Sequence, residues 1–438
     1  MRRSSLLSLL AAFLLLFTVA CSGTDDASTT DDTATDDTAA DDTADDAAGD
    51  DATDDAADEP TDDPADEATD DTDEATEDDE ADDAAADGEP IVVGIVTSTS
   101  GLLGGFGEQY LAGLEAGMDY ATDGTRAVNG RPIELEIVDD GGDAEQAITA
   151  ATDLVGQGVT ILAGTVSSGV ATQIGPFAEE NDVLYISGPA ASDAITGLNS
   201  HTFRSGRQSF QDVATAASLL DDVDGGSVLV FAQDSEFGAG NVAAVEAVLG
   251  DTVGSVDSLL VPLNTSEFTP FAQQVIDADP DLLFVAWAGD TAPAMWQALE
   301  QQGVPEAVTV ATGLADRAVW PVYAAGVEFL SHYFAEAPDT EANAALVEAV
   351  PEADLFTPDG FVAAQMIVQA LTEGSPDDTA SMIAALEGWE FDAPKGTQTI
   401  RASDHAMLQP MFTASLDGDT ATLLDTLDPE AVAPPESE

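Results

Sequence analysis

Short apolar strands, each followed by a loop of Gly, Ser and Asp and then by a helical pattern, constrain the fold of this chain more than any other feature. The first three strands are expected at 91–96, 133–138 and 159–163. A strand that is apolar without interruption is buried on both faces, as in a parallel sheet covered by helices. Loops at the carboxyl ends of such strands form a ligand crevice. The sequence therefore predicts an α/β fold whose function depends on those loops.

The amino terminus is not part of this fold. Arg2 and Arg3 precede an apolar segment at 6–17, and small residues lead to Cys21, the only cysteine. The apolar segment is too short to cross roughly 30 Å of hydrocarbon, so residues 1–20 are predicted to be an export signal peptide. Cys21 resembles the acylated cysteine of a bacterial lipoprotein and is the expected lipidation site. A free thiol in a signal peptide that is cleaved further on is the alternative.

Residues 21–90 are predicted to be a disordered, Asp-rich tether. From 22 to 89 the chain is almost entirely Asp, Ala, Thr and Glu, with 32 acidic residues and no Lys or Arg. Such a segment has too few large apolar side chains to bury a core. A neutral flexible coil of this length spans roughly 45 Å r.m.s., and charge repulsion extends it further. An acidic interaction arm is the alternative.

Acidic residues also dominate the remainder of the chain. Of the 86 acidic residues, 54 lie beyond residue 89 and face only seven of the nine basic residues, so this part alone carries a charge near −47. Such a surface repels phosphate backbones, which excludes nucleic acid as a partner. The same repulsion disfavours the compact state in dilute buffer. We therefore infer a halophilic source and expect the melting temperature to rise in molar salt.

The chain from Ile91 onward is long enough for two lobes. About 348 residues exceed what one hydrophobic core usually covers. A polar extended segment at 201–207 is suited to a crossover, and the alternation of strand and helix repeats after it. Helices are expected at 108–121, 144–156, 171–180, 210–220, after Gly240 to Leu249, and at 270–278, 291–302, 341–350, 357–372 and 379–387. Further strands are expected at 183–187, 227–232, 256–261, 282–287, 308–311 and 327–334. Antiparallel strands are expected within 391–416, and a weakly structured acidic tail from about 417.

Several short motifs occur in a distinctive order. They are Val93-Gly94-Ile95, Ser100-Gly101, Phe106-Gly107, Asn129-Gly130-Arg131, Ser167-Ser168-Gly169, Ser187-Gly188-Pro189-Ala190 and Asp234-Ser235-Glu236-Phe237-Gly238. In this order the chain resembles the leucine/isoleucine/valine-binding protein family, the type I periplasmic solute-binding proteins that serve ABC importers. The resemblance covers almost everything after residue 90.

The resemblance implies two doubly wound, Rossmann-like lobes joined by a three-segment hinge. By similarity, lobe 1 comprises 91–206 and 336–402, lobe 2 comprises 207–335 and 403–427, and 428–438 is an acidic tail. Three crossing segments restrict the motion to a hinge, so that the lobes close on a small solute and the closed form is presented to a permease. A monomer anchored by lipid outside the cytoplasm is expected.

The resemblance also assigns site residues in lobe 1. Ser168 matches the family serine that binds the ligand carboxylate, with Ser167 beside it. A hydroxyl next to free N–H groups at a helix amino terminus is an anion site in its own right, although an N-cap serine is the alternative. Ala190 matches a residue that offers its carbonyl to the ligand amine. Ala191 takes the place of the usual Thr, with Ser192 adjacent.

Aromatic residues are expected around the ligand side chain. Phe106 in lobe 1 and Phe237 and Trp287 in lobe 2 occupy such positions. Packing of these rings against the hinge is the alternative. The usual second-lobe acid, which pairs with the ligand ammonium, is replaced by Leu314, with Asp316 two residues on. A buried ammonium without a carboxylate costs several kcal/mol, so an apolar amide, a short carboxylic acid or an aromatic acid competes with a hydrophobic amino acid as ligand.

No catalytic motif occurs in the sequence. The chain lacks a phosphate-binding Gly-rich loop ending in Lys-Ser/Thr, a G-x-S-x-G elbow and an H-E-x-x-H helix. Its histidines, His201, His332 and His405, are scattered, and the acidic loop at 139–143 is expected to be solvated rather than to bind a cation. We therefore expect no enzyme, no metal and no cofactor. A ligand-sensing ectodomain of the same fold, or less readily an α/β enzyme, is the alternative.

Overall fold

The computed structural model describes residues 88–220, 223–313, 316–317, 319–320, 328–418 and 420–437. The predicted signal peptide, Cys21, the predicted tether as far as residue 87 and Leu314 lie outside the described residues. What was inferred for them from the sequence stays a prediction.

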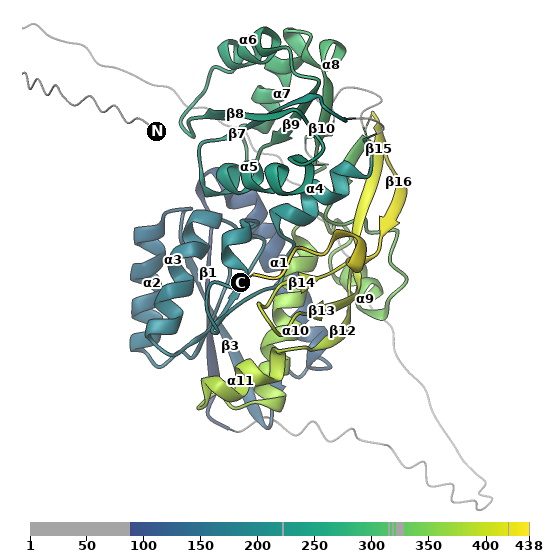
Figure 1. Cartoon of the computed structure of the whole chain (residues 1–438). Coiled ribbons are helices and arrows are strands. Elements are labelled where there is room, and N and C mark those ends of the chain that lie inside the picture. The colour runs from purple at the N-terminus through teal and green to yellow at the C-terminus, as the bar shows by residue number, and fades with distance from the viewer. Residues whose placement is uncertain are drawn as a thin grey trace, which may run out of the picture. The chain divides into compact units, whose positions relative to one another are not determined.

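Lobe 1 is built on a six-stranded sheet with the strand order β2-β3-β1-β4-β5-β6 (Figure 1). The strands are β1 (Ile91–Thr97), β2 (Ala127–Val128), β3 (Arg131–Asp139), β4 (Ile161–Ala163), β5 (Leu184–Ser187) and β6 (Thr202–Arg204). All neighbouring pairs are parallel except β2 with β3. Helices α1 (Gly104–Ala121) and α10 (Thr357–Glu373) cover one face, and α2 (Ala144–Gly156) and α3 (Ser168–Glu180) cover the other. The apolar strands are therefore buried on both faces.

Lobe 2 repeats this plan with four parallel strands in the order β10-β9-β7-β8. They are β7 (Ser227–Gln233), β8 (Ser255–Val261), β9 (Leu282–Ala286) and β10 (Thr309–Thr312). Helices α6 (Thr269–Ala278), α7 (Ala292–Gln301) and α8 (Val304–Ala307) cover one face, and α4 (Ser209–Ala217) and α5 (Glu236–Leu249) cover the other. Helices α4 and α5 lie on the side of lobe 2 that faces lobe 1 (Figure 1).

Three segments cross between the lobes. They are 205–208 after β6, 332–340 after β11 (Glu328–Ser331), and 409–410 between β14 (Met407–Leu408) and β15 (Met411–Asp417). Strand β14 belongs to a small antiparallel sheet with β12 (Glu390–Ala393) and β13 (Gly396–Ile400), next to α9 (Glu341–Ala349) and α11 (Thr379–Leu386). Met407 packs in the core of lobe 1 although the resemblance starts lobe 2 at 403. The exact lobe boundaries stay a prediction.

Helices α1 and α10 approach closely because glycines face the partner backbone. A Cβ on Gly113 would lie 1.8 Å from the carbonyl oxygen of Thr357, and one on Gly360 would lie 1.9 Å from that of Tyr110. No other residue fits at these positions without moving the helices apart.

Helix α1 begins at Gly104, four residues before the start of the helix that the sequence predicts at 108–121. Glycine suggested a turn, but here it serves a close approach: a Cβ on Gly107 would lie 1.8 Å from the carbonyl oxygen of Ser98. Helix α3 likewise begins at Ser168 rather than at 171. The short helix α8 was not expected.

The expectation of a weakly structured tail from about 417 is wrong. Strand β16 (Thr420–Leu427) pairs with β15 along its length, and Val432 is buried in a turn of 3₁₀ helix, η4 (Pro429–Val432). Arg401 donates a hydrogen bond of 2.7 Å to the carbonyl of Pro434, and the Ser437 N–H donates one of 3.0 Å to Asp404. The acidic composition concealed these contacts, because the partners lie elsewhere in the chain.

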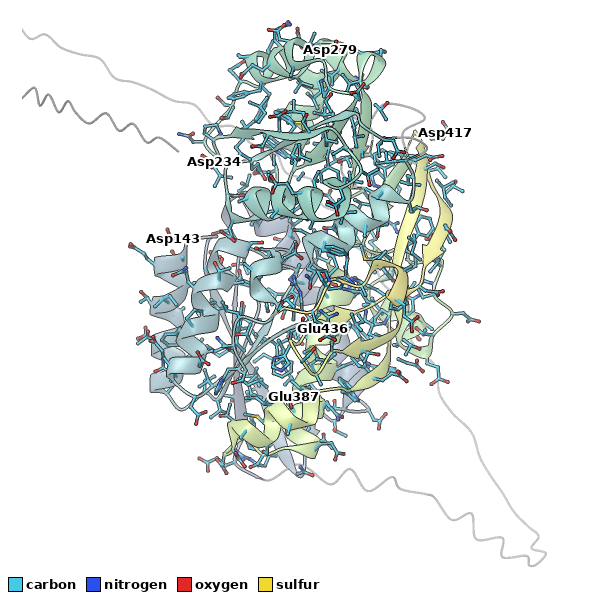
Figure 2. The ribbon with its side chains drawn as sticks, in the orientation of Figure 1. Asp143, Asp234, Asp279, Glu387, Asp417 and Glu436 are labelled. Carbon is cyan, nitrogen blue, oxygen red and sulfur yellow. The ribbon has the colours of Figure 1, made fainter. Side chains whose placement is uncertain are left out.

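Acidic side chains cover the surface of both lobes. Asp143, Asp279 and Asp417 are exposed and lie at the periphery, on different elements (Figure 2). The charge inferred from composition is therefore carried largely by solvated groups, as a surface of mutually repelling carboxylates requires.

Candidate ligand-binding site

A cavity of about 630 Å³ lies between the carboxyl ends of the two parallel sheets. Its volume is in the range of small-molecule sites. Lobe 1 lines it with the start of α1 and the start of α3, and lobe 2 lines it with the start of α5 and the loop after β9. The predicted site residues in its wall are Phe106, Ser167, Ser168, Ala191, Phe237, Trp287 and Asp316.

Ser168 is the first residue of α3 and is almost fully buried in the cavity wall. Its Oγ accepts hydrogen bonds of 3.2 Å from the backbone N–H groups of Ala191 and Ser192. A hydroxyl that accepts twice keeps its own proton to donate. The N-cap is Ser167, whose side chain makes no capping hydrogen bond. The start of α3 therefore presents a hydroxyl donor beside helix N–H groups, which suits an anion.

Two of the predicted residues are not brought into the cavity wall. Ala190 is completely buried, and its carbonyl accepts a hydrogen bond of 2.7 Å from Nη2 of Arg204. Ser192 donates a hydrogen bond of 3.2 Å to Glu236 on lobe 2 and accepts one from the N–H of Ala194. Neither residue lines the cavity. Ala190 therefore supports the loop from behind, and Ser192 joins the lobes.

Neighbouring side chains hold the aromatic rings of the wall. Phe106 packs against Phe356 with the ring centres 4.5 Å apart, and both rings line the cavity. Trp287 stacks on Phe231 at 5.4 Å, and its indole N–H donates a hydrogen bond of 3.0 Å to Thr291. These contacts hold the rings in place, and the rings form apolar walls of the cavity.

Three further cavity residues, which we call the hinge cluster, were not predicted as site residues: Arg207, Asp212 and His332. Nε of Arg207 and Nε2 of His332 each lie 3.3 Å from a carboxylate oxygen of Asp212. Nη1 of Arg207 donates a hydrogen bond of 2.6 Å to the carbonyl of Pro189. The one sequence signal for such a cluster is that basic residues are scarce, so that each of them is a candidate for a specific role. Of the seven basic residues beyond residue 89, three are buried: Arg204, Arg207 and Lys395.

Burial controls the charge of the hinge cluster. It raises the pKa of Asp212 to about 6, against the opposing effect of Arg207. Burial, followed by the positive charges of Arg207 and Lys395, lowers the pKa of His332 well below its ordinary value. At neutral pH the cluster therefore contains one cation, one anion and one neutral imidazole.

The raised pKa of Asp212 predicts a pH dependence of stability. The unfolded carboxyl loses its proton near pH 3.8 and the folded one near pH 6, so the folded state binds more protons between these values and stability falls as the pH rises. We expect the unfolding free energy of the wild type, minus that of Asp212→Asn, to fall by about 2–3 kcal/mol from pH 4 to pH 7. Chemical denaturation at several pH values measures this difference, and parallel curves for the two proteins would contradict it.

The lobes contact each other on two sides of the cavity. The Asp290 N–H donates a hydrogen bond of 3.3 Å to the carbonyl of Leu102, and Ser192 bonds to Glu236. Gly289 has a positive φ of 83°, and a Cβ there would lie 2.4 Å from the carbonyl oxygen of Leu102. The described structure is therefore a closed arrangement of the lobes.

Neither a metal-binding cluster nor a membrane-spanning helix occurs among the described residues. Within them, no group of three or more His, Cys, Asp or Glu side chains is arranged to hold a metal ion. No helix in the same ranges is long and apolar enough to cross a bilayer.

Comparisons with known proteins agree with this geometry. A family model described as periplasmic binding protein matches residues 90–421. The Leu/Ile/Val-binding protein homolog 3 of Brucella melitensis is 24% identical over 330 residues, which cover 72% of this chain and 88% of that protein.

Solved structures show the same fold. A crystal structure of an ABC-type branched-chain amino acid transporter from Rhodopseudomonas palustris is 31% identical, with a TM-score of 0.64, and covers 78% of this chain and 97% of that one. An ABC transporter solute-binding protein from R. palustris HaA2, in complex with p-hydroxybenzoic acid, is 22% identical, with a TM-score of 0.71 and the same coverage. The predicted type I periplasmic binding protein fold is confirmed. The chain belongs to the periplasmic binding protein family and is, with its Leu/Ile/Val-binding relatives, a solute-binding protein of ABC transporters.

Proposed function

We propose that this protein captures a hydrophobic amino acid or a related apolar acid, closes its lobes on it and delivers it to the membrane subunits of an ABC importer. Family membership implies an extracytoplasmic location. Anchoring to the membrane through acylated Cys21 and the acidic tether belongs to the proposal, as does a monomeric state. The observation that supports it most is a cavity between two lobes whose wall contains Ser168 at the start of α3 and several aromatic rings.

Two kinds of relative narrow the ligand class. One solved neighbour is a branched-chain amino acid transporter protein, and another holds p-hydroxybenzoic acid. Both ligand types combine a carboxylate with an apolar body, which suits Ser168 at one end and rings such as Phe106 and Trp287 along the sides. An acid without an ammonium group needs no protein carboxylate as a counter-charge. We therefore place aromatic acids beside branched-chain amino acids as ligands.

A thermal-shift screen tests this function. The mature chain, in molar salt, is mixed with branched-chain and aromatic amino acids, their amides, and short and aromatic carboxylic acids. A ligand at 100 times its Kd stabilises the folded state by about 2.7 kcal/mol, which the melting temperature reports. We expect at least one apolar carboxylate to raise it and sugars or cations not to do so. A screen in which only sugars or polyamines stabilise the protein would contradict the proposal.

Ser168→Ala is expected to weaken binding of that carboxylate by about 1–3 kcal/mol, because a hydrogen bond to a charged group is lost. The substitution also leaves the N–H groups of Ala191 and Ser192 without their acceptor. The melting temperature of the ligand-free variant separates loss of folding from loss of affinity. Unaltered affinity in calorimetry would remove Ser168 from the site.

A further inference from the structure

The cavity between the lobes is large for the ligands named for the relatives. Its volume is about 630 Å³, and because the Asp290 N–H already contacts the carbonyl of Leu102 on the other lobe, this is the volume of the closed arrangement. At roughly 30 Å³ per heavy atom, the share of one water molecule in the liquid, it holds about 20 heavy atoms. A branched-chain amino acid or a hydroxybenzoate has about nine or ten, so either ligand leaves about half of the space unfilled. Native interiors contain few voids of that size.

Water is a poor filler at the strand ends of lobe 2, because polar side chains there are bonded within their own lobe. The side-chain amide of Gln233 donates to the carbonyl of Ala288 and accepts from its N–H, both at 3.0 Å. Thr312 donates a hydrogen bond of 3.0 Å to the carbonyl of Val285. A buried water needs two to four polar partners. This part of the cavity therefore favours an apolar ligand that fills it.

The cavity is also long. Gln233 at the end of β7, Leu263 after β8, Trp287 after β9 and Gly313 after β10 all line it, so it passes the ends of all four strands in the sheet of lobe 2. Neighbouring strands lie about 4.8 Å apart, so four strand ends span about 14 Å. An extended chain advances roughly 1.2 Å per bond, so a leucine molecule spans about 6 Å from carboxylate to methyl. A chain of about ten to twelve carbons matches the cavity in length.

The lobes meet on two sides of the cavity, and Ser168 and Trp287 belong to opposite sides. On the side of Ser168, α3 faces the start of α5, and a Cβ on Gly169 would lie 3.9 Å from Cβ of Glu236. On the other side the loop after β1 contacts Gly289, which follows Trp287 in the loop after β9. A ligand whose carboxylate lies at Ser168 therefore crosses the cavity before its body reaches the indole of Trp287.

The wall continues from Trp287 to an exposed apolar rim. Leu263, in the loop after the edge strand β8, lines the cavity and is 50% exposed, the largest fraction among the large apolar side chains that the structure describes. The indole of Trp287 packs edge-on against Phe268, at the end of the same loop, with the ring centres 5.4 Å apart. Leu102 and Leu103 of lobe 1 line the same cavity and are half-buried. A single exposed leucine is ordinary, but this one extends an apolar wall to which both lobes contribute.

We propose that the solute of this protein is a carboxylic acid with an extended apolar chain of about ten to twelve carbons, bound with its carboxylate at Ser168 and its chain across Trp287 to the rim at Leu263. This inference rests on the proposed function and narrows its ligand class by size. Each methylene that the cavity removes from water raises the affinity, and a ligand with a short body leaves the rim without a contact.

Calorimetric titration of the mature chain in molar KCl with butanoate, hexanoate, octanoate and decanoate tests the length of the site. The 2-amino acids of the same lengths form a second series, because the inference concerns the chain and not the head group. In the series that binds more tightly, we expect one molecule per protein chain and a gain of about tenfold for each two carbons as far as ten carbons. An affinity that stops rising at six carbons would reveal a site sized for a branched side chain and would overturn the inference, while the proposed function would stand.

One variant and a matched control locate the end of the chain. Leu263→Ser is expected to lower the ratio of the ten-carbon to the six-carbon affinity by about fivefold, because the chain end loses its apolar contact. Leu424→Ser changes a leucine of similar exposure, 45%, that lies on β16 outside the cavity wall, and is expected to keep the wild-type ratio. An unchanged ratio in Leu263→Ser would overturn the assignment of the rim.

The inference and the proposed function fail in different ways. Binding of leucine or benzoate with no binding in either series of chains would overturn the inference alone. Failure of every apolar carboxylate to bind, whatever its length, would overturn the proposed function as well.

Discussion

Gly289→Ala is expected to weaken ligand binding by about 3 kcal/mol, roughly 100-fold. In the closed arrangement the new Cβ would lie 2.4 Å from the carbonyl oxygen and 2.7 Å from Cγ of Leu102 on the opposite lobe. The carbonyl is backbone and cannot yield as a flexible side chain does. The variant therefore favours the open arrangement, and a ligand that binds through closure must supply the difference.

Gly225→Ala is the matched control for Gly289→Ala. Gly225 also lies in lobe 2 with a positive φ, 72°, but a Cβ there would meet no atom within 4 Å. Both variants carry the strain of a left-handed alanine, about 1–2 kcal/mol, and only Gly289→Ala carries the contact between lobes. We expect titration calorimetry to give wild-type affinity for Gly225→Ala. A Gly289→Ala protein that binds within threefold of the wild type would show that closure at Leu102 does not control affinity.

Lys395→Met is expected to lower the unfolding free energy by about 3–5 kcal/mol. Nζ of Lys395 lies 2.6 Å from Asp359 and 3.1 Å from Gln409, and both charged side chains are completely buried. Loss of the cation leaves the Asp359 carboxylate without its counter-charge in the interior. Asp359 also lies against Gly206, where a Cβ would be 2.7 Å from Oδ2, so the pair supports the first crossing segment.

An exposed ion pair provides the control for Lys395→Met. Arg126 pairs with Asp119 at 2.5 Å, but its side chain is 41% exposed, and such pairs contribute at most about 1 kcal/mol. In denaturant titrations we expect Arg126→Met to be nearly neutral and the double variant Lys395→Met with Asp359→Leu to recover much of the lost stability. Equal losses for Lys395→Met and Arg126→Met would show that burial of the pair has no energetic consequence.

The sheets and most helices were predictable because their signals are local. Uninterrupted apolar strands such as 91–96 and 159–163 recur as buried parallel strands, and the loops after them line the cavity. The predicted start of α1 was wrong because glycine serves close packing there. Gly107 lies inside α1, and its missing Cβ leaves room for the carbonyl oxygen of Ser98. A single-residue signal does not distinguish a turn from a close approach.

Site residues were predictable only where their role depends on a single loop. Ser168 was predictable because its role depends only on the helix start at which it lies, and it lines the cavity. The hinge cluster unites residues from two crossing regions and α4, and no local pattern relates positions 207 and 332. Ala190 failed to reach the wall because the guanidinium of Arg204 occupies its carbonyl, a contact across 14 positions of sequence. Such pairings become visible only when the chain is folded.

Titration calorimetry of the mature chain in molar KCl, followed by recovery of the ligand, tests capture by lobe closure most directly. The apolar carboxylate selected by thermal shift is titrated into the wild type and into Gly289→Ala, and the recovered compound is identified by mass spectrometry. We expect saturable binding of one ligand per chain, a loss of about 100-fold in the variant, and a ligand returned unchanged. Binding that is equal in the two proteins, or recovery of a different compound, would contradict capture by closure.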